Sequence, residues 1–281
     1  MISNLKRMIT NRLLWNCKNQ GDFAHRATAL CKLKKRSTRV SWDEEKSLFL
    51  VWSSTVPPIY VARRNRVKEK YLRDVDRPRE IFEKYLLPQV PFQKDDIIID
   101  VGANIGELAL HLARTFDVRA ICLEPDPVEF ACLRANMQDP KATLINGALW
   151  NTKTRLEFSM SNDSGDSSLL PSNDRSPRME IETSTLDDIG HDLGLLIPNS
   201  TVKLLKLEAE GAEPEILEGG ASLLRNVQFV SADLGPERGT DKQHTICECV
   251  NLLTQTGFKL AGVNFRTHVY LFRNESLVPT E

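Results

Sequence analysis

From about residue 96 onward the chain alternates between short apolar runs and longer segments with helical periodicity. Runs rich in β-branched residues, such as Ile97-Ile98-Ile99-Asp100-Val101, are typical of strands buried in a sheet. Segments in which apolar residues recur every three or four positions predict helices. Strands are expected at 97–101, 119–123, 142–145, 202–207 and 229–233, and helices at 106–114, 127–136, 213–217 and 247–256. This order implies a parallel sheet with right-handed crossovers.

Two stretches depart from this alternation. Residues 258–263 and 268–272 predict a final antiparallel pair, and residues 156–160 predict an edge strand. Residues 161–178 are dense in Ser, Asn, Asp and Pro, which predicts a loop. Loops of this length are often functional lids, so Ser168 is a candidate for binding the acceptor substrate.

We predict two parts of the chain. Residues 1–78 would form a basic, mostly helical N-terminal extension, and residues 79–281 would form the catalytic domain. Residues 1–40 contain ten Lys or Arg against a single acid, although the whole chain has a net charge of −1. A helix packed on the main domain, or an arm, explains this pattern better than contact with an anionic membrane surface. Residues 41–90 predict a mostly helical lead-in that Pro57-Pro58 interrupts.

Composition narrows the cellular setting. No run of about 18 apolar residues suggests a transmembrane helix, and residues 1–15 are too polar for a signal peptide. The six cysteines have neither disulfide nor metal spacing. A cytoplasmic protein with reduced cysteines and no metal site is therefore expected.

The strongest chemical signal is the turn Asp100-Val101-Gly102-Ala103-Asn104-Ile105-Gly106 between the first strand and its helix. Gly102 and Gly106 allow the backbone to approach a ligand, and the helix points its first amides at that ligand. A dinucleotide fingerprint would be G-x-G-x-x-G, whereas Asn104 occupies the middle position here. Asp100 would repel a pyrophosphate but suits the cationic methionine end of S-adenosylmethionine.

Polar residues also follow the next two strands. Glu124 ends the second strand, where a carboxylate accepts hydrogen bonds from ribose hydroxyls of either NAD or S-adenosylmethionine. Asp126 is either part of this site or a helix N-cap. Asn146 follows the third strand and either faces the adenine or is a turn residue before Gly147.

Together these residues resemble the FkbM family of methyltransferases, over roughly residues 79–275. The matching segments are Ile99–Glu107, Glu124-Pro125-Asp126-Pro127, Thr185-Leu186-Asp187-Asp188 and Lys206-Leu207-Glu208-Ala209-Glu210-Gly211-Ala212-Glu213. Glu208 stands where the family usually has Asp. The resemblance implies a class I (Rossmann-like) α/β fold, with a seven-stranded, mostly parallel sheet and a terminal antiparallel strand. It also implies O-methylation, often of a sugar hydroxyl in a glycan or secondary metabolite. The predicted S-adenosylmethionine site comprises Asp100, Gly102, Ala103, Asn104, Gly106, Glu124, Pro125, Asp126 and Asn146.

Charged residues at the ends of the fourth and fifth strands are the candidates for catalysis. Lys206, Glu208, Glu210 and Asp233 would lie over the cofactor, where an acid takes the proton of the acceptor hydroxyl. A structural ion pair at the strand end is the alternative for the first three residues. Glu237 and Arg238 follow the fifth strand, and we predict that they bind the acceptor. For Glu237 the alternative is an ordinary position in a solvated loop.

Other functional classes remain open at this point. The basic N-terminus allows a nucleic-acid methyltransferase, but no Asn-Pro-Pro-Tyr-like run follows the fourth strand, so nucleic acid is not the expected partner. A binding or scaffold protein on a methyltransferase fold is the non-enzymatic alternative. An NAD oxidoreductase ranks last because of the charge of Asp100.

Overall fold

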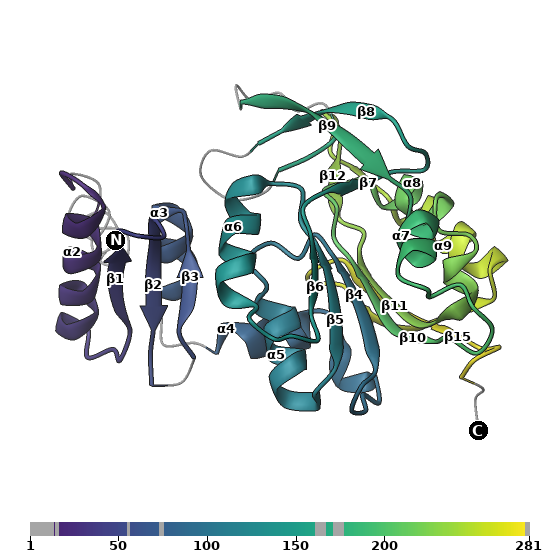
Figure 1. Cartoon of the computed structure of the whole chain (residues 1–281), viewed down its shortest axis with the longest axis horizontal. Helices are drawn as coiled ribbons and strands as arrows, with labels where there is room; N and C mark the ends of the chain where they lie inside the picture. The colour runs from purple at the N-terminus through teal and green to yellow at the C-terminus, as the bar shows by residue number, and fades with distance from the viewer. Residues whose placement is uncertain are drawn as a thin grey trace. The chain divides into compact units, whose positions relative to one another are not determined.

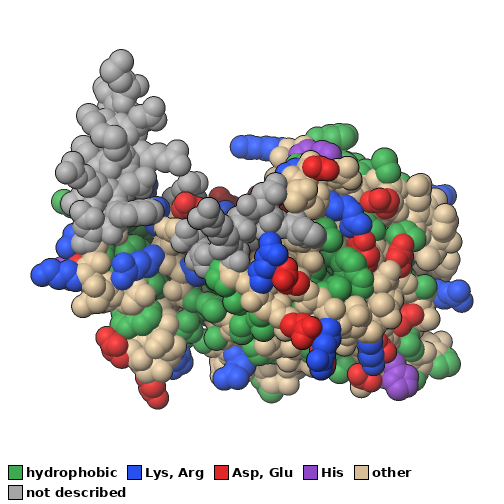
Figure 2. All heavy atoms as spheres, turned by 90° about the horizontal axis from the view of Figure 1, so that it is seen from above, with side chains coloured by type: hydrophobic (Ala, Val, Ile, Leu, Met, Phe, Trp, Pro, Cys, Tyr) green, Lys and Arg blue, Asp and Glu red, His purple; other side chains and the backbone are tan. Residues whose placement is uncertain are grey.

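The computed structural model describes residue 14 and residues 17–54, 57–72, 76–160, 167–170 and 177–278. The chain divides into two compact units, with the division after Glu80. The first 13 residues of the predicted N-terminal extension lie outside the described residues. Acidic and basic side chains are interspersed over the described part of the face drawn in Figure 2.

The N-terminal unit contains an antiparallel sheet where we predicted mostly helix. Helix α2 (Gln20–Leu33) precedes strands β1 (Arg39–Asp43), β2 (Leu48–Trp52) and β3 (Ile59–Val61), which pair in that order. A three-residue helix α3 (Arg64–Arg66) and a π-helical turn η1 (Val67–Tyr71) follow. The expectation of a helical lead-in over residues 41–61 was therefore wrong.

Aromatic packing explains why these residues form strands. Phe49 on β2 is fully buried, with its ring centroid 5.2 Å from that of Phe23 on α2 and 4.8 Å from that of Trp42 on β1. Aromatic and β-branched residues fit the pleated face of a sheet, and contacts across strands stabilise them there. Such contacts depend on tertiary structure, which the local apolar spacing did not reveal.

The second unit is built on a seven-stranded sheet, in the order β14-β15-β11-β10-β4-β5-β6 (Figure 1). Four pairings between β11 and β6 are parallel, whereas β15 runs antiparallel to both of its neighbours. The predicted mostly parallel sheet with a terminal antiparallel strand is confirmed. Its strands are β4 (Ile97–Val101), β5 (Arg119–Leu123), β6 (Thr143–Ile145), β10 (Val202–Leu207), β11 (Val227–Asp233), β14 (Phe258–Asn264) and β15 (Val269–Asn274).

Helices cover both faces of this sheet (Figure 1). Alternate strand residues point to opposite faces, so Ile98 and Leu204 belong to one apolar cluster and Ile99 and Leu205 to the other. The first face packs against α5 and α6, and the second against α7, α8 and α9. The helical segments are α4 (Arg77–Lys84), η2 (Leu87–Gln89), α5 (Glu107–Phe116), α6 (Pro127–Asn136), α7 (Leu186–Asp192), α8 (Glu213–Glu218), η3 (Leu223–Asn226) and α9 (Ile246–Gln255).

Two small sheets lie beside the main one. Strand β9 (Arg178–Ser184) pairs with the predicted edge strand β8 (Arg155–Ser159) and with β7 (Ala148–Leu149). Strands β12 (Pro236–Arg238) and β13 (Gln243–His244) form a hairpin directly after β11. We had predicted β8 but none of the other four strands. Strands β7, β12 and β13 have only two or three residues, which leaves little periodicity to detect, and in the seven-residue β9 only Met179 and Ile181 are apolar. Most of the predicted loop at 161–178 lies outside the described residues. None of the helices in the described ranges has the length and apolar run needed to cross a bilayer.

Candidate functional site

The glycine turn joins β4 to α5 with three left-handed residues. Gly102, Asn104 and Gly106 have φ values of +69°, +53° and +86°. A Cβ on Gly102 would overlap the backbone carbonyl oxygen of Glu208, and one on Gly106 would lie 2.7 Å from Cδ1 of Leu133. Packing against backbone atoms therefore already requires Gly102, whereas at Gly106 the left-handed φ favours glycine and only the Leu133 side chain would have to move.

The carboxylate of Glu124 is held at the end of β5 by backbone amides. Its Oε2 accepts a hydrogen bond from the N–H of Asn104 at 2.7 Å, and its Oε1 accepts one from the N–H of Asp126 at 2.8 Å. The side chain is buried, and burial raises the pKa of Glu124 to about 8 despite these two amides. The carboxyl group thus has a fixed orientation beside the glycine turn, which fits a pair of ribose hydroxyls as donors.

The other residues predicted to bind the cofactor have structural partners at the same edge. Asp126 is the N-cap of α6, since its side chain accepts from the N–H of Val128 at 2.8 Å. The side-chain amide of Asn146 donates to the backbone oxygens of Glu124 at 2.8 Å and of Pro125 at 3.2 Å. The N-cap alternative is confirmed for Asp126, whereas the contacts of Asn146 do not decide between its two alternatives. Roles in cofactor binding stay predictions.

Lys206 connects β10 to the glycine turn from a buried position. Its Nζ lies 3.1 Å from Oδ1 of Asp100 and 3.3 Å from Oε2 of Glu208. It also donates to the backbone oxygens of Val101 at 3.1 Å and of Gly102 at 2.8 Å. Burial alone would lower the pKa of Lys206, but the two carboxylates outweigh burial and raise it. Lys206 is therefore a fixed cation that holds the turn, and Asp100 faces this cation from within the protein.

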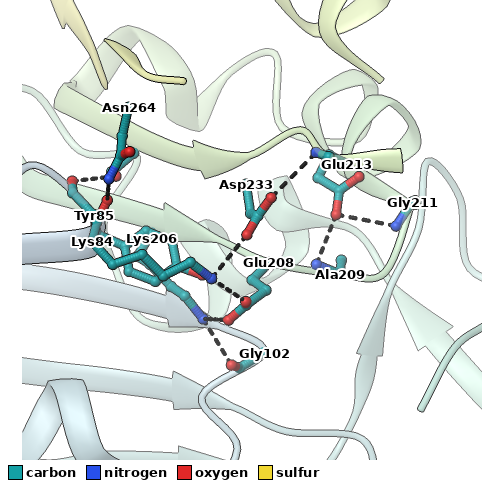
Figure 3. A network of polar contacts seen from close by, with 12 residues as sticks. Lys84, Tyr85, Gly102, Lys206, Glu208, Ala209, Gly211, Glu213, Asp233 and Asn264 are labelled. Atoms are coloured by element: carbon teal, nitrogen blue, oxygen red, sulfur yellow. Dashed lines mark hydrogen bonds and ion pairs between the residues drawn. The ribbon is translucent and has the colours of Figure 1, made fainter. Parts of the chain in front are cut away.

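Lys84, which we did not single out from the sequence, completes a charged network at the ends of β10 and β11 (Figure 3). It is the last residue of α4, and its Nζ lies 2.9 Å from Oε1 of Glu208 and 2.9 Å from Oδ2 of Asp233. The same Nζ lies 3.2 Å from the hydroxyl oxygen of buried Tyr85. The available sequence signal was a lysine at the end of the helix before the first core strand.

Two ammonium groups control the charge of Glu208. Burial would raise the pKa of Glu208, but Lys206 and Lys84 outweigh burial and hold that pKa well below its usual range. Conversely, burial would lower the pKa of Lys84, whereas Glu208 and Asp233 raise it far above its usual value. We name this set the charged network: Lys84, Asp100, Lys206, Glu208 and Asp233. With all five ionised it carries one net negative charge, which suits a cationic methyl donor.

The loop after β10 is organised by Glu213, the first residue of α8. Its Oε1 accepts from the N–H groups of Ala209 at 2.8 Å and of Gly211 at 3.2 Å, and its Oε2 accepts from the Thr245 hydroxyl at 3.2 Å. Burial raises the pKa of Glu213 to about 6. Glu210 has a left-handed φ of +51° and is half-buried in this loop, outside the charged network.

The three residues predicted to bind the acceptor have different surroundings. Arg238 forms a two-pronged ion pair with Glu215, at 2.9 and 2.6 Å, and donates to the backbone oxygen of Gly211 at 2.6 Å. Ser168 donates to the backbone oxygen of Glu210 at 3.2 Å. Glu237 is half-buried, and its Oε2 is buried without a hydrogen-bond partner among the described residues. Acceptor binding by these residues stays a prediction.

The arrangement suits a nucleoside-bearing ligand with a polar acceptor beside it. A turn and an oriented carboxyl group provide surfaces for a nucleoside-bearing ligand, and fixed charges beside them can orient an acceptor. Within the described ranges, no group of three or more His, Cys, Asp or Glu side chains is placed to hold a metal ion.

Comparison with known proteins agrees with this chemistry. A family model described as "Methyltransferase FkbM domain" matches residues 100–259. The 2-O-methyltransferase NoeI of Sinorhizobium fredii is 25% identical over 177 residues, which cover 57% of this chain and 71% of that protein. The hexuronic acid methyltransferase AglP of Haloferax volcanii is 29% identical over 151 residues, covering 50% of this chain and 57% of that protein. The 31-O-demethyl-FK506 methyltransferase FkbM of Streptomyces tacrolimicus is 29% identical over 177 residues, covering 50% of this chain and 66% of that protein.

Proposed function

Because this chain belongs to the FkbM methyltransferase family, we propose that it transfers a methyl group from S-adenosylmethionine to a sugar hydroxyl, in a glycan or a secondary metabolite. The family and the fold imply a methyltransferase with an S-adenosylmethionine-type donor. The names of two similar proteins, a 2-O-methyltransferase and a hexuronic acid methyltransferase, support an acceptor of this kind.

The observation that carries the proposal is the position of the charged network. Lys206 and Glu208 lie at the carboxyl end of β10, on the same edge of the sheet as the glycine turn and Glu124. Asp233 is the last residue of the neighbouring strand β11. In open α/β sheets, ligands bind outside the carboxyl ends of the strands. A cofactor bound at Glu124 and the turn would therefore have the network beside it.

The chain's own residues supply orientation rather than covalent chemistry in this proposal. Glu124 would hold the ribose hydroxyls, the 102–106 turn would lie along the donor, and Asn146 would border the adenine. The donor supplies an activated methyl group when bound. Lys84 and Lys206 fix the carboxylates of Glu208 and Asp233 in place, so these acceptors of hydrogen bonds are preorganised for a sugar hydroxyl.

Calorimetric titration with S-adenosylmethionine and S-adenosylhomocysteine tests donor binding. Glu124→Gln replaces one of the two carboxyl oxygens that the ribose hydroxyls would meet with an NH2 group, which cannot accept a hydrogen bond, and we expect it to weaken both ligands roughly 10-fold to 100-fold. The matched control is Glu182→Gln, because Glu182 lies on β9 with its side chain 74% exposed. Failure of the unmodified protein to bind either ligand, or equal affinities in the two variants, would contradict the assignment of this site.

The acceptor class needs a separate measurement. Methyl transfer from labelled donor should be assayed with methyl glycosides of neutral hexoses and hexuronic acids, and the product mapped by NMR. Labelled methyl on a ring hydroxyl oxygen is the expected result. Donor binding without transfer to any hydroxyl would refute O-methylation while leaving the donor site intact.

A further inference from the structure

Most carboxylates at this edge of the sheet are already committed to partners. Glu208 lies between two ammonium groups, and Asp233 accepts from Lys84 and from the N–H of Gly235 at 3.2 Å. Glu213 uses both oxygens for its three donors. A carboxylate whose charge is neutralised by lysines, as in Glu208, has little tendency to take a proton.

Glu237 differs from these residues in its contacts. It is the middle residue of β12, immediately beyond the end of β11, and its N–H donates to the backbone oxygen of Gly235 at 2.9 Å. Its Oε2 is inaccessible to solvent, yet it has no hydrogen-bond partner among the described residues. Buried polar atoms are nearly always hydrogen-bonded, so this unpartnered oxygen, which has Asp233 and Glu208 among its charged neighbours, indicates a missing donor.

We propose that Glu237 is the catalytic base, the residue that accepts the proton of the acceptor hydroxyl during methyl transfer. This inference rests on the function proposed above and names the group that performs its proton transfer. The acceptor oxygen gives its proton to the Glu237 carboxylate and bonds to the methyl carbon, while the carbon–sulfur bond breaks and its electron pair stays on sulfur. Glu237 then releases the proton to solvent.

The charges around Glu237 suit this role. Burial raises the pKa of Glu237 to about 8, and the nearby carboxylates of Asp233, Glu208 and Glu213 act in the same direction. Lys84 acts against them but does not outweigh them. A base is most effective when its pKa lies near the operating pH, which excludes Glu208 and favours Glu237.

Proton release on donor binding tests this inference without an acceptor. A nearby cation favours the ionised carboxylate, so the sulfonium of S-adenosylmethionine should expel a proton from Glu237, whereas neutral S-adenosylhomocysteine should not. Titrations at pH 7.5 in buffers of different ionisation enthalpy measure the protons released by each ligand. Both ligands carry the ribose, so the effect of ribose contacts on Glu124 is common to them, and the Glu237→Gln variant separates the effect of the sulfonium on Glu237 from its effect on Glu124.

We expect the unmodified protein to release a larger fraction of a proton with S-adenosylmethionine than with S-adenosylhomocysteine. The difference should vanish in Glu237→Gln and persist in the control Glu248→Gln, which removes an exposed carboxylate from α9. A difference that persists in Glu237→Gln, or that is absent from the unmodified protein, overturns the proposal.

Kinetics provide the second test, with the methyl glycoside that the unmodified protein methylates best. Donor kcat/KM should rise with pH to a plateau above about 8, because only ionised Glu237 accepts a proton. Glu237→Gln should lower kcat by roughly 100-fold or more and remove this dependence, with donor affinity unchanged within about threefold. A kcat within threefold of the unmodified protein overturns the role of Glu237. If the unmodified protein methylates none of the glycosides, the proposed function is contradicted. That conclusion holds even if the proton-release experiment shows that Glu237 loses a proton when the donor binds.

Discussion

Replacement of Gly102 by alanine tests whether the glycine turn is required by packing within the chain. The added Cβ would overlap the carbonyl oxygen of Glu208 and lie 3.2 Å from its carbonyl carbon. Both atoms belong to the backbone that leaves β10, so no side-chain rotation relieves the overlap. The φ of Gly102 is +69°, which alanine adopts only at a cost.

The chain provides a control that separates these two costs. Gly194 has a φ of +68°, and a Cβ there would have no atom within 4 Å. Gly194→Ala therefore measures conformational strain alone, about 1–2 kcal/mol. Gly102→Ala adds an overpacking cost of about 1–3 kcal/mol, because β4 and the β10 loop must separate. We expect Gly102→Ala to lower the Tm by roughly 5–15 °C, and Gly194→Ala by less than half as much.

Thermal unfolding followed by circular dichroism, at one scan rate and pH, measures both variants. Titration with S-adenosylhomocysteine below the Tm then shows whether the displaced turn still binds ligand, and we expect weaker binding only for Gly102→Ala. Melting temperatures within about 2 °C of one another would refute the packing argument. Equal stability with lost binding only in Gly102→Ala would instead mean that the glycine serves the ligand.

Three further predictions concern the charged groups. Lys206→Met leaves Asp100 buried without its cation, so the free energy of unfolding, measured in urea, should fall by about 3–5 kcal/mol. Adding Asp100→Asn to this variant should recover part of that loss. Arg238→Lys replaces the two-pronged contact with Glu215 by a point charge and should lower the Tm by a few degrees, and an unchanged Tm would show that the ion pair contributes nothing. Burial raises the pKa of Glu124 from 4.5 to about 8, so the folded state binds this proton more tightly than the unfolded state does. The stability that the bound proton contributes is fully present below pH 4.5 and is lost as the pH rises through 8. The free energy of unfolding should therefore decrease over this range less steeply in Glu124→Gln, and parallel curves would contradict the raised pKa.

Local sequence determined where most strands of the main sheet lie along the chain. Strands at 97–101, 119–123 and 202–207 have the predicted bounds, as does the helix at 127–136. Buried strands need an apolar side chain at nearly every position, and an amphipathic helix needs one every three or four, so both patterns are visible within about ten residues. The glycine turn was equally visible, because the left-handed residues of a tight turn are restricted in type.

Tertiary structure decided how the charged residues are used. Lys206 and Asp100 are more than a hundred residues apart in the chain, and the register of β10 against β4 brings them together. Lys84 reaches Glu208 and Asp233 only because α4 ends beside the carboxyl edge of the sheet. A sequence lists candidate charges, but the distances that set their pKa values arise from strand register and helix packing.

In the N-terminal unit, tertiary contacts rather than local sequence decided the secondary structure. Residues 39–61 contain enough apolar residues for either a helix or strands, and the contacts of Phe49 with α2 and β1 stabilise the strands. The chemistry of the methyl donor could therefore be read from short motifs, because those motifs are local. The fold of the first unit and the ion pairs of the charged network were decided by long-range packing, because most of these contacts join residues that are distant in sequence.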